Sequence, residues 1–217
     1  MMGGGCPGGA LHMRRETGAD PGEVGAELEL ERRLGLATPA DSVRGMFFRS
    51  VLEVMWALGD EASVEHCVEV CGRRKFADFT CYPTGDFLRL SWTAARLLGN
   101  GYGDFAGAMR ALGRRAATDF FASATGRPLQ TLLAGEPRKL LDSLPMAYAA
   151  ASANGGQCVV AWSHSGSALV RLERDFLPRA YVEGALVAAL EVVGMREPRV
   201  WSRVLGPLSS EYVLSWG

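Results

Sequence analysis

Residues 154–156 (Asn-Gly-Gly) divide the sequence into two parts in which apolar side chains recur at different spacings. Before them, apolar residues recur at every third or fourth position over several long segments, which is the pattern of helices with one buried face. After them, the runs 157–162 and 168–173 read as two strands joined by a turn at 163–167, as in a β-hairpin. Helices in one part and hairpins in the other predict an α+β fold, in which the helices cover one face of an antiparallel sheet.

About six helices are expected before residue 154. The first begins after residues 38–41 (Thr-Pro-Ala-Asp), which supply a capping side chain, a proline for the first turn and an acidic residue. Its few polar residues lie on one side, so this helix should be mostly buried. The segments expected to be helical are 41–58, 61–71, 86–98, 104–122, 128–134 and 137–153, the last interrupted at Pro145 because proline lacks the N–H that a helix interior needs.

The C-terminal third is expected to form a ββαββ unit. After the hairpin come an almost wholly apolar helix, 178–193, and two strands, 199–205 and 211–216, joined by a turn at 206–207. Hairpins of this size do not fold alone, so helices and sheet should form a single α+β domain over residues 26–217.

The N-terminal residues 1–25 are Gly-rich and show no periodicity, so they are expected to form a disordered tail. A short helix should follow at 26–34. A chain that begins at Leu36 is therefore expected to unfold at the same temperature as the full chain.

The helix expected at 178–193 is apolar almost all round, and one of its faces must cover the sheet. The remaining faces need either the other helices or a second chain, because exposure of such a stripe to water is unfavourable. Two interpretations stay open. The helix is buried within one domain, or one side forms a homodimer contact in which Gly184 lets two backbones approach closely.

The charge balance limits the classes of partner. The 217 residues include 23 Lys and Arg against 24 Asp and Glu, a net charge of −1, so no nucleic-acid partner is expected. The sequence contains no run of 18 apolar residues, which argues against a membrane span. Five cysteines, an odd number, together with no recognisable signal peptide, predict reduced thiols and a cytoplasmic location.

The densest group of metal-binding residue types is His66, Cys67, Cys71 and Cys81. Cys67 and Cys71 would share one helix face, and zinc accepts both residue types. His66, however, points about 100° away from Cys67 on a helix, and a cysteine pair at this spacing is more typical of a hydrophobic core. We therefore expect no metal site and no cofactor. The histidines at 12, 66 and 164 also suit a heme ligand poorly.

No catalytic residue is expected either. Residues 163–165 (Ser-His-Ser) lie in a hairpin, whereas a nucleophile elbow needs Gly-x-Ser-x-Gly between a strand and a helix. The glycines of 99–103 join two helices and lack the lysine of a phosphate loop. Glu183 and Glu191 are two helical turns apart, about 12 Å, which is too far for a paired acid and base. The basic run 73–75 fits a solvated helix end, with an acidic partner as the alternative.

Several segments resemble the signatures of an uncharacterised protein family, a domain of unknown function that is largely confined to myxobacteria. The resemblance extends over about residues 38 to 216, and the family has no established activity. The matching segments are 41–48 (DSVRGMFF), 79–83 (FTCYP), 87–90 (FLRL), 111–114 (ALGR), 144–148 (LPMAY), Gly184 and 212–216 (YVLSW).

Helices followed by ββαββ also resemble vinyl-reductase-type domains, heme–nitric-oxide-binding domains and trafficking-complex subunits of that fold, whose ligands lie between helices and sheet. The zinc ligands that vinyl-reductase-type domains carry near the chain end have no counterpart here, since no Cys follows Cys158 and no His follows His164. Because an apolar helical layer is expected to cover a sheet and no catalytic constellation is apparent, we interpret the chain as a non-enzymatic sensory or adaptor domain that acts through a protein partner. A small apolar ligand between helices and sheet is a further expectation. An enzyme of unknown class, or a heme- or metal-binding sensor, stays open as the alternative.

Overall fold

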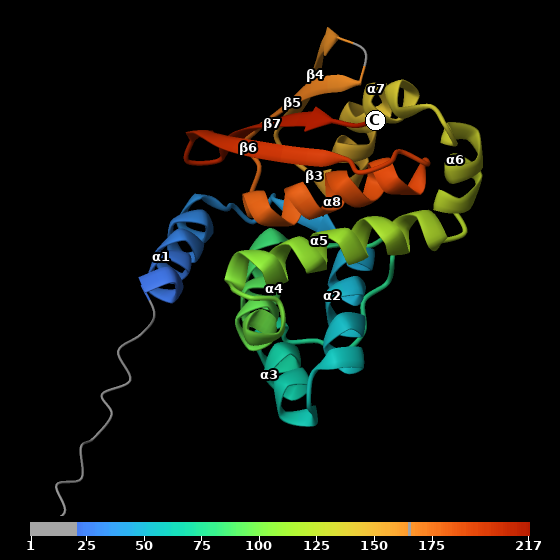
Figure 1. Ribbon diagram of the computed structural model, residues 1–217. Helices are drawn as coiled ribbons and strands as arrows, with labels where there is room; N and C mark the ends of the chain where they lie inside the picture. The colour runs from blue at the N-terminus through green and yellow to red at the C-terminus, as the bar shows by residue number, and fades with distance from the viewer. Residues whose placement is uncertain (1–20, 165) are drawn as a thin grey trace, which may run out of the picture.

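Seven α-helices precede the main sheet in the part of the chain that the computed structural model describes, residues 21–164 and 166–217 (Figure 1). Their ends follow from local sequence. Asp60 caps α3 (Glu61–Cys71) by accepting a hydrogen bond from Ser63 N at 2.7 Å, and Gly72 ends the helix with a φ of +68°. Asp104 caps α5 (Phe105–Ala122) by accepting a hydrogen bond from Gly107 N. The helices are α1 (Pro21–Leu36), α2 (Gly45–Leu58), α3 (Glu61–Cys71), α4 (Thr84–Leu98), α5 (Phe105–Ala122), α6 (Gly126–Leu133) and α7 (Pro137–Ala151), with a 3-10 turn η1 (Gly99–Gly101) between α4 and α5.

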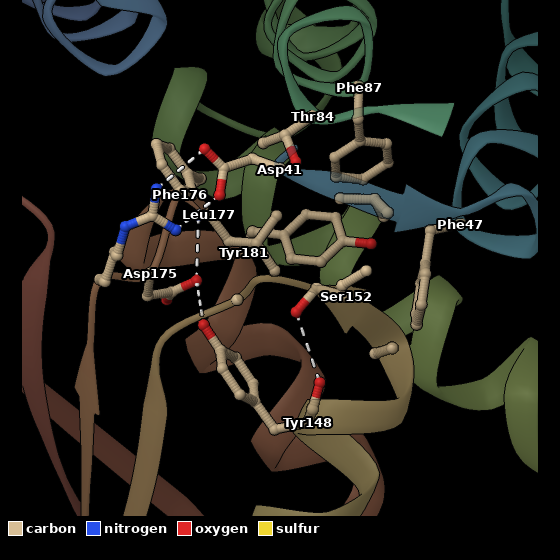
Figure 2. A pocket seen from close by; sticks show the side chains of 15 residues that line it. Asp41, Phe47, Thr84, Phe87, Tyr148, Ser152, Asp175, Phe176, Leu177 and Tyr181 are labelled. Atoms are coloured by element: carbon tan, nitrogen blue, oxygen red, sulfur yellow. Dashed lines mark hydrogen bonds and ion pairs between the residues drawn. The ribbon is translucent and has the colours of Figure 1, made fainter. Parts of the chain in front are cut away.

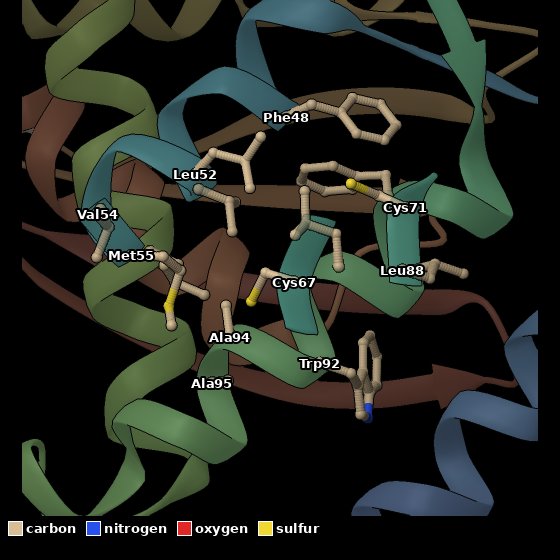
Figure 3. Packing of buried hydrophobic residues seen from close by; sticks show 14 of the residues in the cluster. Phe48, Leu52, Val54, Met55, Cys67, Cys71, Leu88, Trp92, Ala94 and Ala95 are labelled. Atoms are coloured by element: carbon tan, nitrogen blue, oxygen red, sulfur yellow. The ribbon is translucent and has the colours of Figure 1, made fainter. Parts of the chain in front are cut away.

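The helical part has its own hydrophobic core. Figure 3 shows side chains of α2, α3 and α4 lying together, among them Leu52, Cys67 and Leu88. All three are almost completely excluded from solvent. The indole of Trp92 fixes α1 to this core, because its Nε1 donates a hydrogen bond to the carbonyl of Ala26 at 2.9 Å.

The main sheet is antiparallel, with the strand order β4-β5-β7-β6, and is formed by β4 (Gln157–His164), β5 (Ser167–Glu173), β6 (Arg199–Gly206) and β7 (Ser209–Ser215). The even-numbered residues of its central strands, such as Val170, Tyr212 and Leu214, point to the helical side and are fully buried. Together with α8 (Arg179–Val192) these strands form the predicted ββαββ unit, so the predicted α+β fold is confirmed.

Helix α8 lies between this sheet and α5 (Figure 1). Two glycines allow the helices to cross closely. A Cβ on Gly184 would lie 2.0 Å from the carbonyl oxygen of Arg110, and one on Gly113 would lie 1.9 Å from that of Tyr181. The close approach that we expected of Gly184 is therefore made to α5 of the same chain rather than to a second copy.

Three short strands differ from the sequence-based expectation. Residues 42–44, expected as the first turn of a helix, form β1 (Ser42–Arg44), and α2 begins only at Gly45. The strand β1 pairs with β2 (Cys81–Pro83) on one side and β3 (Ser152–Ala153) on the other. Thr38 does not cap a helix, contrary to the sequence-based expectation. Its amide and hydroxyl instead donate hydrogen bonds to the carboxylate of Asp41 in a turn before the strand.

Two helix boundaries also differ. Pro145 does not interrupt α7, which is continuous from Pro137 to Ala151, because Leu140 and Leu141 before it and Tyr148 after it all pack on the sheet side. Helix α1 begins at Pro21, so residues 21–25 of the expected tail are helical. The rest of that tail, residues 1–20, lies outside the described residues. Within the described residues, no helix combines the length and the hydropathy needed to cross a membrane.

Candidate functional site

A cavity of about 70 Å³ lies where the helical part meets the sheet part. Its wall is mostly apolar. The wall is formed by β1 and β3 of the small three-stranded sheet (β2-β1-β3), by the helices α2, α4, α7 and α8, and by the loop 174–177. Figure 2 shows aromatic side chains around it, including Phe47, Phe87 and Phe176. The cavity therefore contacts nearly every element that joins the two parts.

Tyr181 of α8 lines this cavity and carries a buried hydroxyl that has no hydrogen-bond partner among the described residues. Its side chain is 3% exposed. In Figure 2 the ring crosses the centre of the group and the hydroxyl points to the side on which Phe47 lies. A buried hydroxyl without a partner is unfavourable by about 1–3 kcal/mol, a cost that a hydrogen-bonding ligand at this position would offset.

Asp175 and Tyr148 form a hydrogen-bonded polar pair at the cavity. The Tyr148 hydroxyl and the Leu177 amide both donate to Oδ1 of Asp175, each at 3.1 Å. Burial raises the pKa of Asp175 to about 6, although the Leu177 amide, the charge of Arg33 and the Tyr148 hydroxyl act in the opposite direction. Burial and the neighbouring Asp175 also raise the pKa of Tyr148, so the phenol stays protonated as the donor.

A bidentate ion pair closes one side of the cavity. Arg174 Nη1 and Nη2 donate to Oδ1 and Oδ2 of Asp41 at 2.5 and 2.9 Å, and Nη1 also reaches the carbonyl of Asn154. Burial alone would raise the pKa of Asp41, but the hydrogen bonds from Arg174 and Thr38 hold it below its usual value. Arg174 has a φ of +54°, a region that non-glycine residues rarely adopt and that is often found at functional sites.

Helix α1 reaches the same region through Arg33, which is 4% exposed. Its Nη1 donates to the carbonyls of Asp175 and Leu177 at 3.1 and 3.0 Å, while Glu29 holds the other side of the guanidinium. The loop that carries Asp175 is thus fixed by α1 as well as by α7.

The sequence-based metal candidates do not come together. Cys67 and Cys71 are buried in the helical core, and burial raises the pKa of Cys67 to about 12, which disfavours a thiolate ligand. His66 is on the exposed side of α3 near Glu69, and Cys81 is exposed in β2. In the part of the chain that the structure describes, no three His, Cys, Asp or Glu residues cluster as a metal site.

The catalytic candidates are occupied in structural contacts. Ser163 bonds to the hydroxyl of Ser167 across the hairpin, and residue 165 of the same turn lies outside the described residues. Glu183 pairs with Arg110 of α5 and Glu191 with Arg114, so these acids join α8 to α5. The glycines of 99–103 form the turn between α4 and α5, as expected.

Sequence reasoning missed Asp175, Tyr148 and Tyr181. One signal was available. Asp175 lies between Arg174 and the apolar run 176–178, in the short connection from a strand to an apolar helix. Both of these elements are expected to be buried, so an aspartate between them is a candidate buried carboxyl. The partner Tyr148 could not be found in this way, because it is brought to Asp175 only by the packing of α7.

The fold is that of H-NOX domains, as comparison with solved structures shows. A mutant H-NOX protein of K. algicida in the Fe(II) unliganded form has a TM-score of 0.63 at 11% identity, covering 80% of this chain and 96% of that chain. An H-NOX protein of S. oneidensis in the Fe(II)NO state has a TM-score of 0.60 at 9% identity, covering 80% and 99%. An oxygen-binding H-NOX domain related to soluble guanylate cyclases has a TM-score of 0.58 at 10% identity, covering 80% and 94%.

In sequence, residues 36–217 match the family described as a protein of unknown function, DUF2378, and the chain belongs to this family. The expected resemblance to a family of unknown function and the expected fold resemblance to heme–nitric-oxide-binding (H-NOX) domains are thereby confirmed. No curated protein matches the chain in sequence.

The residues present do not fit a heme, the group found in this fold class. His66 and His164 are outside the cavity wall, and His12 lies outside the described residues. The wall offers two phenols, but burial raises the pKa of both Tyr148 and Tyr181, which opposes the phenolate that an iron ligand requires. The cavity is also far below the roughly 300 Å³ at which sites for drug-sized ligands begin.

Proposed function

We propose that the chain is a non-enzymatic sensory domain that binds a small, mostly apolar ligand in the cavity between the helices and the sheet. The observation that carries this proposal is the buried hydroxyl of Tyr181, unpartnered among the described residues, in an otherwise apolar wall. The H-NOX-like fold supports a sensory role. The free thiols of Cys67, Cys71, Cys81 and Cys158 support a reducing, cytoplasmic location.

The size of the cavity limits the ligand. A dry cavity of roughly 150 Å³ accepts benzene, with its six carbons, so about 70 Å³ suits a molecule of about three non-hydrogen atoms. The ligand should carry a single hydrogen-bond acceptor for the Tyr181 hydroxyl and be apolar elsewhere. The best ligands gain no more than about 1.5 kcal/mol per atom, so we expect dissociation constants of about 1 mM at best.

Because the cavity lies between the helical part and the sheet part, ligand binding can change how these two parts contact each other. Its wall includes β1 and α4 from the helical part and the loop 174–177 next to the sheet. A ligand that fills the cavity contacts elements of both parts and would stabilise the arrangement in which they are packed together around it. A protein partner that contacts both parts would then distinguish the filled from the empty state.

Acetonitrile tests the proposal, because it has three non-hydrogen atoms and one acceptor, and its nitrile stretch reports hydrogen bonding. We expect saturable binding by NMR, with chemical-shift changes centred on the cavity and a nitrile band shifted by a hydrogen bond. In Tyr181→Phe the affinity should fall about fivefold to tenfold and the band shift should disappear. Xenon, which needs no donor, should bind both proteins equally well.

Tyr102→Phe is the matched control, since Tyr102 is 40% exposed and lies in the connection between α4 and α5. It should bind acetonitrile like the wild type. Chemical shifts that show no saturation near the cavity, or equal affinity in Tyr181→Phe and wild type, would exclude this site.

A further inference from the structure

Two carboxyl groups line the cavity, and their charges are balanced in different ways (Figure 2). Asp41 accepts the two parallel hydrogen bonds of Arg174. Asp175 is 4% exposed, but the donors to its Oδ1 are the neutral hydroxyl of Tyr148 and the neutral amide of Leu177. Among the described residues, no basic side chain forms an ion pair with Asp175. Asp175 is therefore a buried acid in the cavity wall without a direct counter-ion.

The guanidinium of Arg33, which faces Asp175 from α1, is bonded to other acceptors. Its Nη1 donates to the backbone carbonyls of Asp175 and Leu177, and its Nε and Nη2 donate to the carboxylate of Glu29. The charge of Arg33 lowers the pKa of Asp175, but burial raises it by more, so that this pKa is about 6. The carboxyl can therefore gain or lose its proton near neutral pH.

The other titratable groups that face Asp175 do not change their charge in this range. They are Tyr148 from α7, Cys158 from β4 and Tyr212 from β7, and burial raises the pKa of each of them. In the cavity wall, the hydrogen bonds from Arg174 and Thr38 hold the pKa of Asp41 below its usual value. Within this group, only Asp175 titrates between about pH 5 and pH 8.

Occupation of the cavity changes the surroundings of the Asp175 carboxyl. At roughly 30 Å³ per molecule, a cavity of about 70 Å³ has room for about two waters, which can donate hydrogen bonds to an ionised carboxylate. An apolar ligand takes the place of this water and offers the carboxylate no donor. The charged form of Asp175 loses solvation in the exchange, whereas the neutral form loses little. The ligand should therefore bind more tightly while Asp175 carries its proton.

We infer that the cavity binds uncharged ligands and releases them when Asp175 loses its proton, so that the domain responds to ligand and pH together. This inference rests on the proposed function, because it concerns the regulation of the same site. Above the pKa of Asp175, each ligand that binds must be accompanied by uptake of a proton. The affinity should then fall by about fivefold to tenfold from pH 5 to pH 8, since desolvation of a carboxyl changes its ionisation constant by a factor of this size or more.

Xenon tests the inference, because it is apolar, uncharged and needs no donor from Tyr181. NMR titration of the full chain with xenon should show this loss of affinity between pH 5 and pH 8. In Asp175→Asn, which cannot ionise, the affinity should be the same at both pH values. Asp142→Asn is the matched control, since Asp142 of α7 is exposed and accepts a hydrogen bond from Trp162 outside the cavity wall. It should keep the pH dependence of the wild type.

The reciprocal measurement needs no variant. Carbon-13 NMR of the wild type should show a higher pKa for the Asp175 carboxyl under xenon than without it, because linkage between two sites acts equally in both directions. Saturable xenon binding that is equal at pH 5 and pH 8, or a pH dependence that persists in Asp175→Asn, would overturn this inference and leave the proposed function intact. Absence of saturable binding at both pH values would overturn the two together.

Discussion

Asp41 and Arg174 are 133 residues apart in the sequence and form a pair of parallel hydrogen bonds across the junction between the helical part and the sheet. The side chain of Asp41 is 2% exposed and that of Arg174 41%. The buried Asp41 carboxylate therefore relies on Arg174 to balance its charge, whereas the Arg174 guanidinium is also exposed to water. The same pair borders the cavity, so it links the position of the small sheet to the loop that carries Asp175.

Arg174→Ala should lower the free energy of unfolding by about 1–2 kcal/mol, because it leaves the Asp41 carboxylate buried without its partner. In a chain of this size that corresponds to a fall in melting temperature of about 3–6 °C. Arg89→Ala is the matched control. It removes an exposed pair with Asp86 and should change the stability by no more than about 0.5 kcal/mol. Equal melting temperatures for the two variants would contradict a structural role for the Asp41 pair.

Asp175 predicts an unusual dependence of stability on pH. Its folded pKa of about 6 lies above the ordinary 3.8, so between these values the folded state binds more protons than the unfolded state. Its contribution to stability is therefore fully present below about pH 4 and is lost as the pH rises through about 6. The groups that face this carboxyl are Arg33 from α1, Tyr148 from α7, Cys158 from β4 and Tyr212 from β7.

Asp175→Asn keeps an acceptor for Tyr148 and Leu177 but cannot ionise. Relative to wild type it should gain about 2 kcal/mol between pH 4.5 and pH 7, measured by urea unfolding at each pH. The pKa values of Glu211 and Asp41 are lowered, so the stability that they contribute falls as the pH drops below their ordinary values of 4.5 and 3.8, at or below the lower edge of this window. This contribution is also the same in wild type and variant. A stability difference between variant and wild type that does not change with pH would contradict the buried, titrating carboxyl.

Gly184→Ala should destabilise the protein by about 2–3 kcal/mol, since the new Cβ would lie 2.0 Å from the Arg110 carbonyl and α5 and α8 would have to separate. Gly35→Ala is the control, because no atom lies within 4 Å of a Cβ there and alanine favours the helix. Chemical denaturation distinguishes the two. If Gly184→Ala is as stable as wild type, the crossing of the two helices is not as close as described.

Removal of all residues before Leu36, expected from the sequence to be harmless, should instead lower the melting temperature by at least about 5 °C. It deletes the carbonyl that accepts from Trp92 and the Arg33 bonds to the loop 175–177. Arg33→Ala should reproduce part of this fall, whereas Arg32→Ala, at an exposed position of the same helix, should not. An unchanged melting temperature for the shortened chain would instead support the expectation from the sequence that the residues before Leu36 are not needed for stability.

The sequence was informative where structure depends on local spacing. The helix from Glu61 to Cys71 and the hairpin from Gln157 to Glu173 follow from apolar periodicity and turn residues, and they were predicted close to their observed bounds. The strands β1, β2 and β3 contain two or three residues each, too few to show a period. Ser42 and its partner Ala153 are brought together by the whole helical part, so no local pattern could indicate their pairing.

The same reason explains why the site was not predicted. Asp41 has the sequence context of the first turn of a helix, and only the folded chain shows its contact with Arg174. The apolar character of the helix around Gly184 left burial within one chain or a dimer open, and the distance to Arg110 accounts for Gly184 within the chain. Cys67 and Cys71 were considered as metal ligands because of their residue type alone. In the structure they lie in the hydrophobic core of the helical part.

A crystal structure of the protein soaked in acetonitrile tests the central claim most directly. We expect density for the ligand inside the cavity, with the nitrile nitrogen about 2.7–3.2 Å from the Tyr181 hydroxyl and the methyl group against Phe87 or Phe47. Crystals of Tyr181→Phe should show weaker density or none at that position. A cavity that holds no acetonitrile in the wild type, or ligand density that is the same in the variant, would contradict the assignment of this cavity as the ligand site.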